Sequence, residues 1–311
     1  MRYGFGIDLG GTTVKLAFFE ENGTCLSKWE IPTDKSDNGV RILPDIAASV
    51  AKYLEKNQIP RENVLGIGIG VPGSADPQGI VFSCINLGWG RMDVPQELGK
   101  LTGLPVACGN DATLAALGEC WQGAGNENMI FITLGTGVGG GIVCGGNIIA
   151  GVHGAGGEIG HIPLCPEDTI PCNCGKRGCA EQYLSATGIV RLAKEALALP
   201  HEASSLDSGE LSAKSIFDAG REKDALALSV LDRYFDLMGR FLGILCCMVD
   251  PDVIVLGGGV SKAGQMLLDG ILEPMKKYAF APCRTTRLAL ATLGNDAGIY
   301  GAFKLSLQNF G

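Results

Sequence analysis

The sequence of 311 residues has no run of basic residues, and its formal net charge is −8. Proteins that bind nucleic acid or an anionic membrane surface need clustered Lys and Arg side chains for this contact. The composition therefore predicts a protein that binds neither nucleic acid nor a membrane.

Signals for export and membrane insertion are also lacking. The longest apolar stretch, residues 241–249, falls well short of the ~20 residues that cross a bilayer. Met1 leads directly into YGFGID, without a charged leader, an apolar segment and a cleavage site. We therefore expect a cytoplasmic protein whose 12 cysteines are reduced thiols rather than disulfides.

Glycine is abundant, with 47 residues, and it concentrates at the ends of apolar runs that are typical of strands. Strands are expected at 3–9, 14–20 and 24–30, with a hairpin turn at Asn22-Gly23. The strand-to-glycine junction at 7–10 recurs 125 residues later, at 132–135. This repeat predicts two related lobes; chance similarity between Gly-rich hairpins is the alternative.

The length also favours two domains. We expect a small N-terminal lobe of residues 1–112, to which residues 297–311 return, and a large lobe of residues 113–296. In the large lobe, apolar residues from Leu228 to Val249 recur at spacings of three and four, which predicts a core helix that Pro251 ends. Strands are further expected at 64–71 and 253–256, and helices at 41–56, 261–279 and 296–308.

Three glycine-rich loops are suited to bind a nucleotide, because glycine lets backbone N–H groups approach phosphate oxygens closely. In DLGGTT at 8–13, Asp8 can hold Mg²⁺ with ATP; LGTGVGGG at 134–141 offers a second cradle, and LGGGV at 256–260 can pass under an adenosine. Each loop alone is as readily a structural turn, and none matches a P-loop or a dinucleotide fingerprint. The residues expected to contact the nucleotide are Asp8, Gly10, Gly11, Thr12, Thr13, Gly135, Thr136, Gly137, Gly257, Gly258 and Gly259.

Five motifs together resemble the ROK family of sugar kinases and repressors, and within it the bacterial glucokinases. They are DLGGTT, Asn110-Asp111, LGTGVGGG, GEIGH at 157–161 and CNCGKRGCAE at 172–181. The resemblance implies an α/β fold of the actin-like ATPase type, with two ribonuclease-H-like lobes, mixed sheets and a cleft between the lobes. It also implies transfer of the γ-phosphoryl group of Mg-ATP to a hexose, with glucose as the expected acceptor and glucose 6-phosphate as the product.

Phosphoryl transfer to an alcohol needs a carboxylate that accepts the proton of the attacking hydroxyl. Asp111 is the candidate for this general base, because it follows the probable strand 106–108 and precedes the helical run 112–121. The alternative is that Asp111 only caps this helix. The resemblance favours the base.

A sugar presents hydroxyl groups that a selective site answers with carboxylates and amides. The resemblance assigns these contacts to a set of seven residues. For two of them, Glu158 and Glu181, the alternative is a solvated position on the surface. The expected sugar-binding residues are Gly73, Asn86, Asn110, Asp111, Glu158, His161 and Glu181.

A histidine and three cysteines have the spacing H-x10-C-x-C-x4-C, which suits tetrahedral Zn²⁺. The ligands would be His161, Cys172, Cys174 and Cys179, with Cys165 near enough in sequence to substitute for one of them. Four protein ligands leave no position for water, so the zinc would be structural and would orient the imidazole toward the sugar. The alternative is a loop of reduced cysteines in which His161 contacts only sugar; His153 and His201 are expected to be ordinary surface histidines.

Other protein classes, acceptors and donors are the alternatives to this function. A ROK repressor would need a DNA-binding module ahead of Asp8, and a pure ATPase would not explain GEIGH or the cysteine cluster. Fructose, allose, mannose, N-acetylmannosamine and N-acetylglucosamine are alternative acceptors, and polyphosphate is an alternative donor. The resemblance further implies a homodimer or homotetramer.

Overall fold

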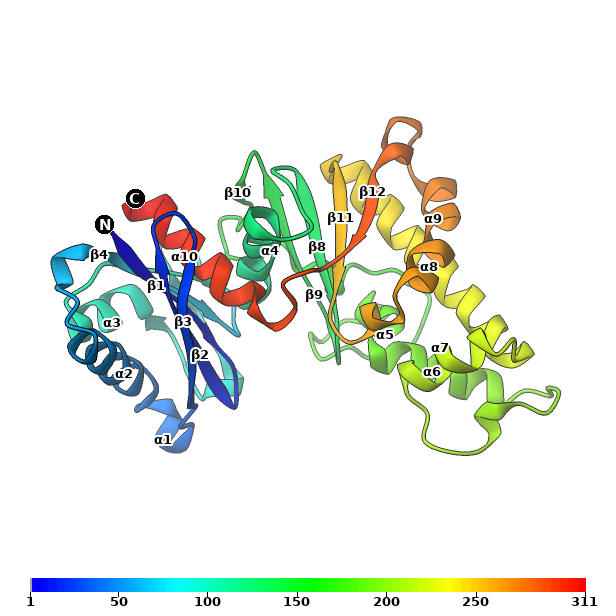
Figure 1. The fold of residues 1–311 in the computed structure, drawn as a ribbon. Helices are drawn as coiled ribbons and strands as arrows, with labels where there is room; N and C mark the ends of the chain where they lie inside the picture. Colours follow the sequence, from blue (N-terminus) through cyan, green and yellow to red (C-terminus); the bar gives the residue numbers. More distant parts are fainter. Residues whose placement is uncertain (1) are drawn as a thin grey trace. The chain divides into compact units, whose positions relative to one another are not determined.

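A computed structural model describes residues 2–311, which form two compact units. Unit 1 contains residues 2–127, 141–157 and 292–311, and unit 2 contains residues 128–140 and 158–291. Figure 1 shows the helices and strands of both units.

Unit 1 is built on a five-stranded sheet of order β3-β2-β1-β4-β7, in which β1 and β2 are antiparallel and β1, β4 and β7 are parallel. Its strands and helices are β1 (Tyr3–Leu9), β2 (Thr13–Glu20), β3 (Cys25–Pro32), α1 (Ser36–Gly39), α2 (Ile42–Lys56), β4 (Val64–Val71), β5 (Ile80–Val81), β6 (Met92–Asp93), α3 (Val94–Thr102), β7 (Val106–Asn110), α4 (Asp111–Gln122), β10 (Asn147–Ile148) and α10 (Ala297–Phe310).

Unit 2 holds most of a second sheet, whose order is β10-β9-β8-β11-β12. Strand β9 begins in unit 2 and ends in unit 1. The remaining elements are β8 (Met129–Leu134), β9 (Val138–Cys144), α5 (Glu181–Leu184), α6 (Ala186–Leu197), α7 (Ala213–Arg221), α8 (Ala225–Val249), β11 (Val253–Gly257), α9 (Gln265–Tyr278) and β12 (Arg287–Leu290).

The two sheets repeat one topology. In the first sheet, β1 pairs with β2 and β2 pairs with β3, while β4 and β7 follow in parallel on the other side of β1. In the second sheet, β8, β9 and β10 take the places of β1, β2 and β3, and β11 and β12 take those of β4 and β7. The predicted repeat of the junctions 7–10 and 132–135 is therefore confirmed, because both lie where the first strand of a sheet ends. The α/β class with two mixed sheets is also confirmed.

Alternating glycines explain how the sheet of unit 1 is covered on both faces. Phe5, Ile7 and the other large residues of β1 and β4 pack against α2 and α3 on one face, where Figure 1 shows these two helices together. On the opposite face a Cβ atom at Gly6 would lie 2.1 Å from the Ile299 carbonyl oxygen, and one at Gly68 would lie 1.7 Å from that of Ala302. Glycine in alternate positions thus lets the backbone of α10 lie directly on the strands.

Helix α4 belongs to the same unit because it packs closely against α10. A Cβ atom at Gly118 would lie 2.2 Å from the carbonyl oxygen of Ala297, and one at Gly301 would lie 1.7 Å from that of Leu114. The return of residues 297–311 to the first sheet was predicted, whereas the unit also includes residues 113–127 and 141–157, which the sequence assigned to the large lobe.

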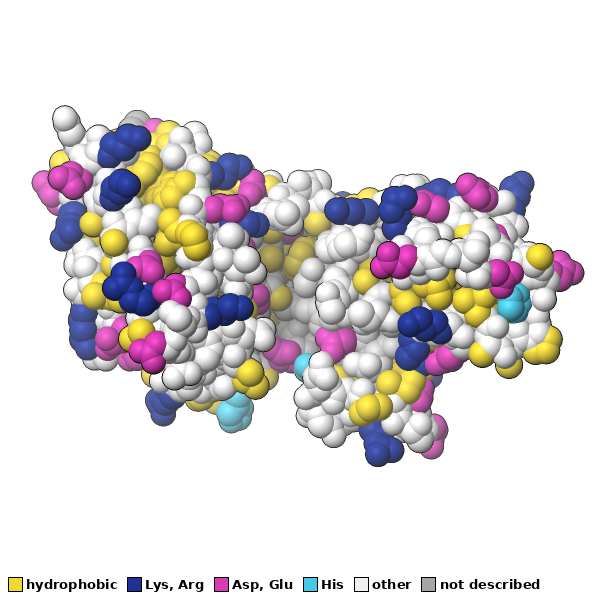
Figure 2. All heavy atoms as spheres, turned by 90° about the horizontal axis from the view of Figure 1, so that it is seen from below, with side chains coloured by type: hydrophobic (Ala, Val, Ile, Leu, Met, Phe, Trp, Pro, Cys, Tyr) yellow, Lys and Arg dark blue, Asp and Glu magenta, His cyan; other side chains and the backbone are white. Residues whose placement is uncertain are grey.

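In unit 2 the apolar strands β8 and β11 pair in parallel and are almost wholly buried. Helix α8 confirms the expected core helix, and it packs against α9 where Gly239 faces Pro274. All 12 cysteines are free thiols. Among residues 2–311, no helix combines the length and the apolar character that a membrane crossing requires. On the face seen in Figure 2, Lys and Arg side chains are scattered among acidic ones rather than gathered into a patch.

Candidate functional site

The predicted site residues of unit 1 lie at one edge of its sheet. Strands β1, β4 and β7 run parallel, and their register pairs Asp8 with Gly70 and Gly70 with Gly109. The residues that follow these three positions therefore leave the sheet at the same edge. This edge carries the loop 10–13, the loop at Gly73 and the pair Asn110-Asp111.

The first glycine-rich loop is a tight turn supported by the residue that follows β3. The Gly10 N–H donates to the Thr13 carbonyl oxygen at 3.0 Å, and the Thr33 hydroxyl donates to the Gly10 carbonyl oxygen at 2.7 Å. A Cβ atom at Gly11 would meet no atom within 4 Å, so this part of the loop is open to a ligand. Burial raises the pKa of the Asp8 carboxyl, and the Lys15 ammonium group partly offsets this effect.

Asn110 and Asp111, at the start of α4, have separate roles in the structure. Asn110 is the N-cap of α4, since its side-chain oxygen accepts from the Thr113 N–H at 3.0 Å, while its amide donates to the Gly73 carbonyl oxygen at 3.3 Å. Asp111 is the first residue of the helix, and its Oδ1 accepts from the Ala112 N–H at 2.7 Å and from the Asn110 amide at 3.1 Å. Asn110 therefore fills the cap position that was the alternative role of Asp111.

The Gly73 loop packs against the segment that carries Asn86. A Cβ atom at Gly73 would lie 2.9 Å from the Ser83 carbonyl oxygen, and the Cys84 thiol donates to the Pro72 carbonyl oxygen at 3.0 Å. Asn86 itself is exposed on the 3₁₀ turn η2 (Ile85–Leu87).

In unit 2 the second and third glycine-rich loops follow neighbouring parallel strands. The register pairs Thr133 at the end of β8 with Gly257 at the end of β11. Gly258 has a φ of +83°, and a Cβ atom there would lie 2.6 Å from the Leu134 carbonyl oxygen, so only glycine fits this crossing of the two loops. The structure thus brings residues 135–137 and 257–259 together.

Glu181, the first residue of α5, contacts the second loop. Its Oε2 accepts from the Val138 N–H at 3.0 Å, and its Oε1 lies 4.0 Å from the Cys172 thiol. A Cβ atom at Gly137 would lie 2.2 Å from the same carboxylate. Glu181 therefore links the cysteine cluster to a predicted phosphate-binding loop, which excludes the alternative of a simply solvated side chain.

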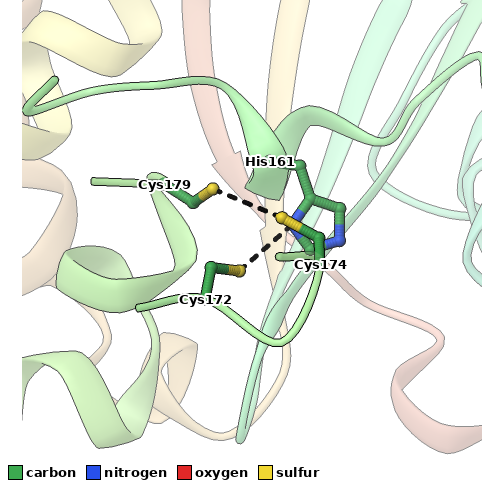
Figure 3. A group of neighbouring side chains, drawn as sticks. All are labelled: His161, Cys172, Cys174 and Cys179. Atoms are coloured by element: carbon green, nitrogen blue, oxygen red, sulfur yellow. Dashed lines mark hydrogen bonds between the residues drawn. The ribbon is translucent and has the colours of Figure 1, made fainter. Parts of the chain in front are cut away.

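The four predicted metal ligands converge in unit 2 (Figure 3). One possible ligand atom from each of His161, Cys172, Cys174 and Cys179 lies within 4.8 Å of the others. The Cys174 and Cys179 sulfur atoms are 3.6 Å apart, as are the Cys172 sulfur and the His161 Nδ1 atom. Tetrahedral zinc with bonds of about 2.3 Å to sulfur separates its ligand atoms by about 3.8 Å, so the arrangement fits this metal.

Cys165 is not part of this group of four. In the cluster, burial is the main factor that raises the pKa of Cys179 to about 12, whereas the N–H of Lys176 lowers the pKa of Cys174. The thiols thus occupy unlike surroundings within one small loop.

The imidazole of His161 presents its two nitrogen atoms to different groups. Nδ1 faces the thiols, as Figure 3 shows, and Nε2 lies 3.9 Å from the Glu158 carboxylate. The short 3₁₀ turn η3 (Ile159–His161) follows Glu158 directly and holds the two side chains near each other. By contrast, His201 bonds to the Leu199 carbonyl oxygen and the Asp207 carboxylate, and His153 is exposed.

A cavity of about 180 Å³ adjoins the third glycine-rich loop. Its walls are Gly259, Val260 and the turn after them on one side, and α7 with Lys214, Phe217 and Arg221 on the other. Sequence reasoning missed these α7 residues. They lie about 40 positions before the loop, and their apolar and basic pattern is that of any amphipathic surface helix.

The comparisons with known proteins agree with this geometry. A model of the ROK family matches residues 4–309. The chain is 45% identical to a glucokinase from Halalkalibacterium halodurans in an alignment of 309 positions that covers 96% of this chain and 93% of that protein. Among solved structures, it is similar to a ROK hexokinase from Thermus thermophilus, with a TM-score of 0.82 and 30% identity over 99% of this chain and 98% of the other. A ROK family glucokinase from Streptomyces griseus, in complex with glucose and AMPPNP, has a TM-score of 0.73 and 33% identity over 98% of this chain and 99% of the other.

Proposed function

Since the chain belongs to the ROK family, we propose that it is an ATP-dependent glucokinase in which Asp111 is the general base. The protein phosphorylates a hexose, and its similarity to glucokinases, one of them in complex with glucose and AMPPNP, makes glucose the acceptor and ATP the donor. The product is glucose 6-phosphate.

The observation that carries the role of Asp111 is its position at the sheet edge. The carboxylate is held by the Ala112 N–H and the Asn110 amide, and Asn110 is itself fixed by Thr113 and by the Gly73 carbonyl oxygen. A base held in one orientation loses little entropy when it meets the sugar hydroxyl. In the reaction, Asp111 accepts the hydroxyl proton as the sugar oxygen forms its bond to the γ-phosphorus of ATP and the bond from this phosphorus to the leaving ADP breaks.

The nucleotide is bound by the three glycine-rich loops. The backbone N–H groups at 10–13 and 135–137 hold phosphate oxygens, and residues 257–259 with the α7 cavity receive the nucleoside. Mg²⁺ that arrives with ATP supplies positive charge to the β- and γ-phosphates, and Asp8 would hold it.

The sugar hydroxyls are bound by Asn110, Glu158, His161 and Glu181, with further contacts at Gly73 and Asn86. Zinc held by His161, Cys172, Cys174 and Cys179 would be structural, since four protein ligands fill its coordination sphere. With Nδ1 directed to the thiols and bound to zinc, His161 would carry its proton on Nε2, which is then available to donate to a sugar hydroxyl.

The proposed function is tested by supplying Mg-ATP with a panel of sugars and following ADP formation. The panel contains glucose, fructose, mannose, allose, N-acetylglucosamine and N-acetylmannosamine. We expect the highest kcat/KM with glucose. A higher value with another sugar would refute the acceptor, and no ADP with any sugar would refute the kinase.

The donor is tested by replacing ATP with inorganic polyphosphate and measuring glucose 6-phosphate. We expect formation of this product with ATP only. Turnover with polyphosphate alone would refute ATP as the dedicated donor.

A further inference from the structure

A second cavity, of about 320 Å³, lies within unit 1 between α4, α10 and β10 (Figure 1). We call it the Asp76 cavity; its walls include Asp76, Asn110, Asn147, Leu305 and Gln308. Of the residues proposed to bind sugar, only Asn110 lines it, and none of its described wall residues is Lys, Arg or His. The volume suits a small organic molecule, and the lack of basic side chains disfavours a phosphate or another anion.

Asp76 gives this cavity a negative charge without a positive partner. Its Oδ1 atom accepts from the N–H groups of Gln78 and Ile80, at 3.0 and 2.9 Å, which fixes the carboxylate on the turn before β5. Among residues 2–311, no donor bonds to its Oδ2 atom and no basic side chain pairs with it. A positively charged ligand would therefore be attracted to this oxygen.

Two side-chain amides of the walls supply further acceptors. The Asn147 amide donates to the Gly145 carbonyl oxygen at 2.9 Å. The Gln308 amide donates to the Gly146 carbonyl oxygen, also at 2.9 Å. Because a carbonyl oxygen only accepts, these bonds identify the nitrogen atom of each amide. The two amide oxygens have no donor in the described part of the chain, so they can accept from N–H groups of a ligand.

The end of α10 adds a partial negative charge of its own. The carbonyl groups in the last turn of a helix lack helical partners, so this end attracts cations. Gln308 and its neighbours from the last turns of α10 line the cavity, and the last turn has no basic residue. The start of α4 also lines the cavity, but its first N–H groups are bonded to the side chains of Asp111 and Asn110. The polar walls thus favour a cation.

The remaining wall of the Asp76 cavity is apolar. Ile148 of β10 and Leu305 of α10 line it, and both pack against the fully buried Leu114 of α4 while they stay partly exposed themselves. Covering such surface with methylene groups is favourable, because it removes apolar area from water. The ligand therefore combines positive charge with an aliphatic chain.

We propose that the Asp76 cavity is an effector site for an aliphatic diamine or polyamine. Its ammonium groups contact the Asp76 carboxylate and the amide oxygens of the walls, and its methylene chain lies over Ile148 and Leu305. Neither an anion nor a neutral polyol meets all of these features.

Asn110 connects this cavity to the proposed active site. Thr113 also lines the cavity, and its N–H group and hydroxyl donate to the Asn110 side-chain oxygen at 3.0 and 3.2 Å. The Asn110 amide in turn donates to Asp111. A ligand packed against this cap restricts Asn110 before the sugar arrives, so less entropy is lost when glucose binds. This effect on glucose rests on the proposed function, whereas binding of the diamine does not.

Titration calorimetry without glucose or nucleotide tests the cavity alone. The probe is cadaverine, a diamine with five methylene groups; its controls are pentanediol, which is neutral, and glutarate, which is negative. We expect one saturable site for cadaverine, with an affinity about tenfold or more above that of either control. The absence of saturable cadaverine binding would overturn the site, and equal affinity for pentanediol would overturn the role of charge.

Variants of the walls locate the binding. Asp76→Asn removes the charge but keeps the oxygen that accepts from the backbone, so cadaverine should bind about tenfold or more weakly. The matched control is Glu97→Gln, which removes an exposed carboxylate of α3 that lies outside the cavity walls. Gln308→Glu adds a second carboxylate to the walls and should strengthen binding. Equal losses in Asp76→Asn and Glu97→Gln, or weaker binding to Gln308→Glu, would overturn the assigned site.

A second set of titrations tests the effector role. Saturating cadaverine should raise the affinity for glucose by about threefold or more, and by linkage glucose should raise the affinity for cadaverine by the same factor. The KM for glucose in assays with Mg-ATP should fall in the unaltered protein and stay constant in Asp76→Asn. Equal changes in both proteins would overturn coupling through the cavity. Failure of the unaltered protein to phosphorylate glucose would instead refute the proposed function, and the titration of cadaverine alone would still decide the site.

Discussion

At the scale of single residues, Asn110 supports the fold, whereas Asp111 is proposed to accept the proton. Asn110 caps α4 and bonds to the Gly73 loop, so the helix does not depend on Asp111 for its N-cap. Asp111 can therefore be replaced with limited harm to the fold.

We predict that Asp111→Asn lowers kcat by about 10³-fold or more, since removal of a general base costs about 10²- to 10⁴-fold in rate. The amide oxygen can still accept from the Ala112 N–H, so glucose affinity should change by less than about threefold. A coupled ADP assay measures kcat, and titration calorimetry measures the affinity. Near-normal turnover would mean that another group takes the proton.

The cysteine cluster gives a second prediction at this scale. Cys174→Ser should release zinc from the purified protein and raise the KM for glucose several-fold, because His161 and Glu181 lose their common support. The matched control is Cys247→Ser, which alters another exposed thiol far along the chain. Elemental analysis measures the zinc content of both variants. An equal zinc content in the two would contradict the assignment of Cys174 as a zinc ligand.

The spacing of His161 and the cysteines was sufficient to predict their cluster, because short loops leave few ways to place four ligands. The Asp76 cavity was not predictable, since Asp76 and Gln308 in its walls lie more than 230 positions apart in the sequence. For the same reason, the bond between Glu181 and the Val138 N–H appears only in the structure.

At the scale of elements, the longest helix depends on its N-cap. Partial burial acts to raise the pKa of Asp224, but N–H groups of Ala227 and Ser205 and hydroxyls of Ser204 and Ser205 outweigh it and lower the pKa to about 2. A carboxyl group whose pKa falls on folding stabilises the fold above its ordinary pKa, near 3.8, and loses this contribution as the pH falls toward 2.

We therefore predict that Asp224→Ala lowers the free energy of unfolding by about 1–2 kcal/mol at pH 7. The difference from the unaltered protein should shrink steadily between about pH 4 and pH 2. Urea titrations at several pH values measure it, with Asp232→Ala on the exposed side of the same helix as the control. A difference that is constant with pH would contradict the assigned cause.

The contact of α10 with the first sheet gives a further prediction. Gly68→Ala should destabilise unit 1 by about 3 kcal/mol, because its Cβ atom would overlap the Ala302 carbonyl oxygen at 1.7 Å. Gly90→Ala is the control, since a Cβ atom there would meet nothing within 4 Å. Thermal unfolding of the two variants compares them directly, and equal melting temperatures would contradict the packing described for this face.

Elements with a strong pattern were predicted well. The core helix, the hairpin at Asn22-Gly23 and the strand at 64–71 all match the structure, because apolar spacing and turn chemistry act locally. The expected helix 261–279 is instead a 3₁₀ turn, η5 (Val260–Ala263), followed by α9, because Gly264 has a φ of +69° between them. The two-residue strands β5 and β6 are too short to give any pattern.

At the scale of the whole molecule, the repeat of glycine junctions predicted two related lobes, and the structure shows that the two five-stranded sheets share one topology. The limits of the lobes were harder to predict. Residues 113–127 join unit 1 through the contact of Gly118 with α10, which closes a gap of almost 180 positions in the sequence. Such long-range backbone contacts leave no local signal.

Binding of glucose should stabilise the whole chain. At a concentration 100 times its dissociation constant, a ligand that binds only the folded state adds about 2.7 kcal/mol to the free energy of unfolding. We predict a rise of several degrees in the melting temperature with glucose and none with sorbitol, and the same rise for Asp111→Asn. Differential scanning calorimetry measures it; a variant that melts at an unchanged temperature in glucose would mean that Asp111 is needed for binding itself.

The position of α10 has a consequence for the folding of the chain during translation. The helix that covers the glycine face of β1 and β4 is translated more than 220 residues after these strands. Until α10 has been made, the strands carry a bare surface, so a nascent chain halted before residue 297 offers chaperones and proteases an uncovered sheet. Synthesis of α10 thus completes a sheet whose strands were made much earlier.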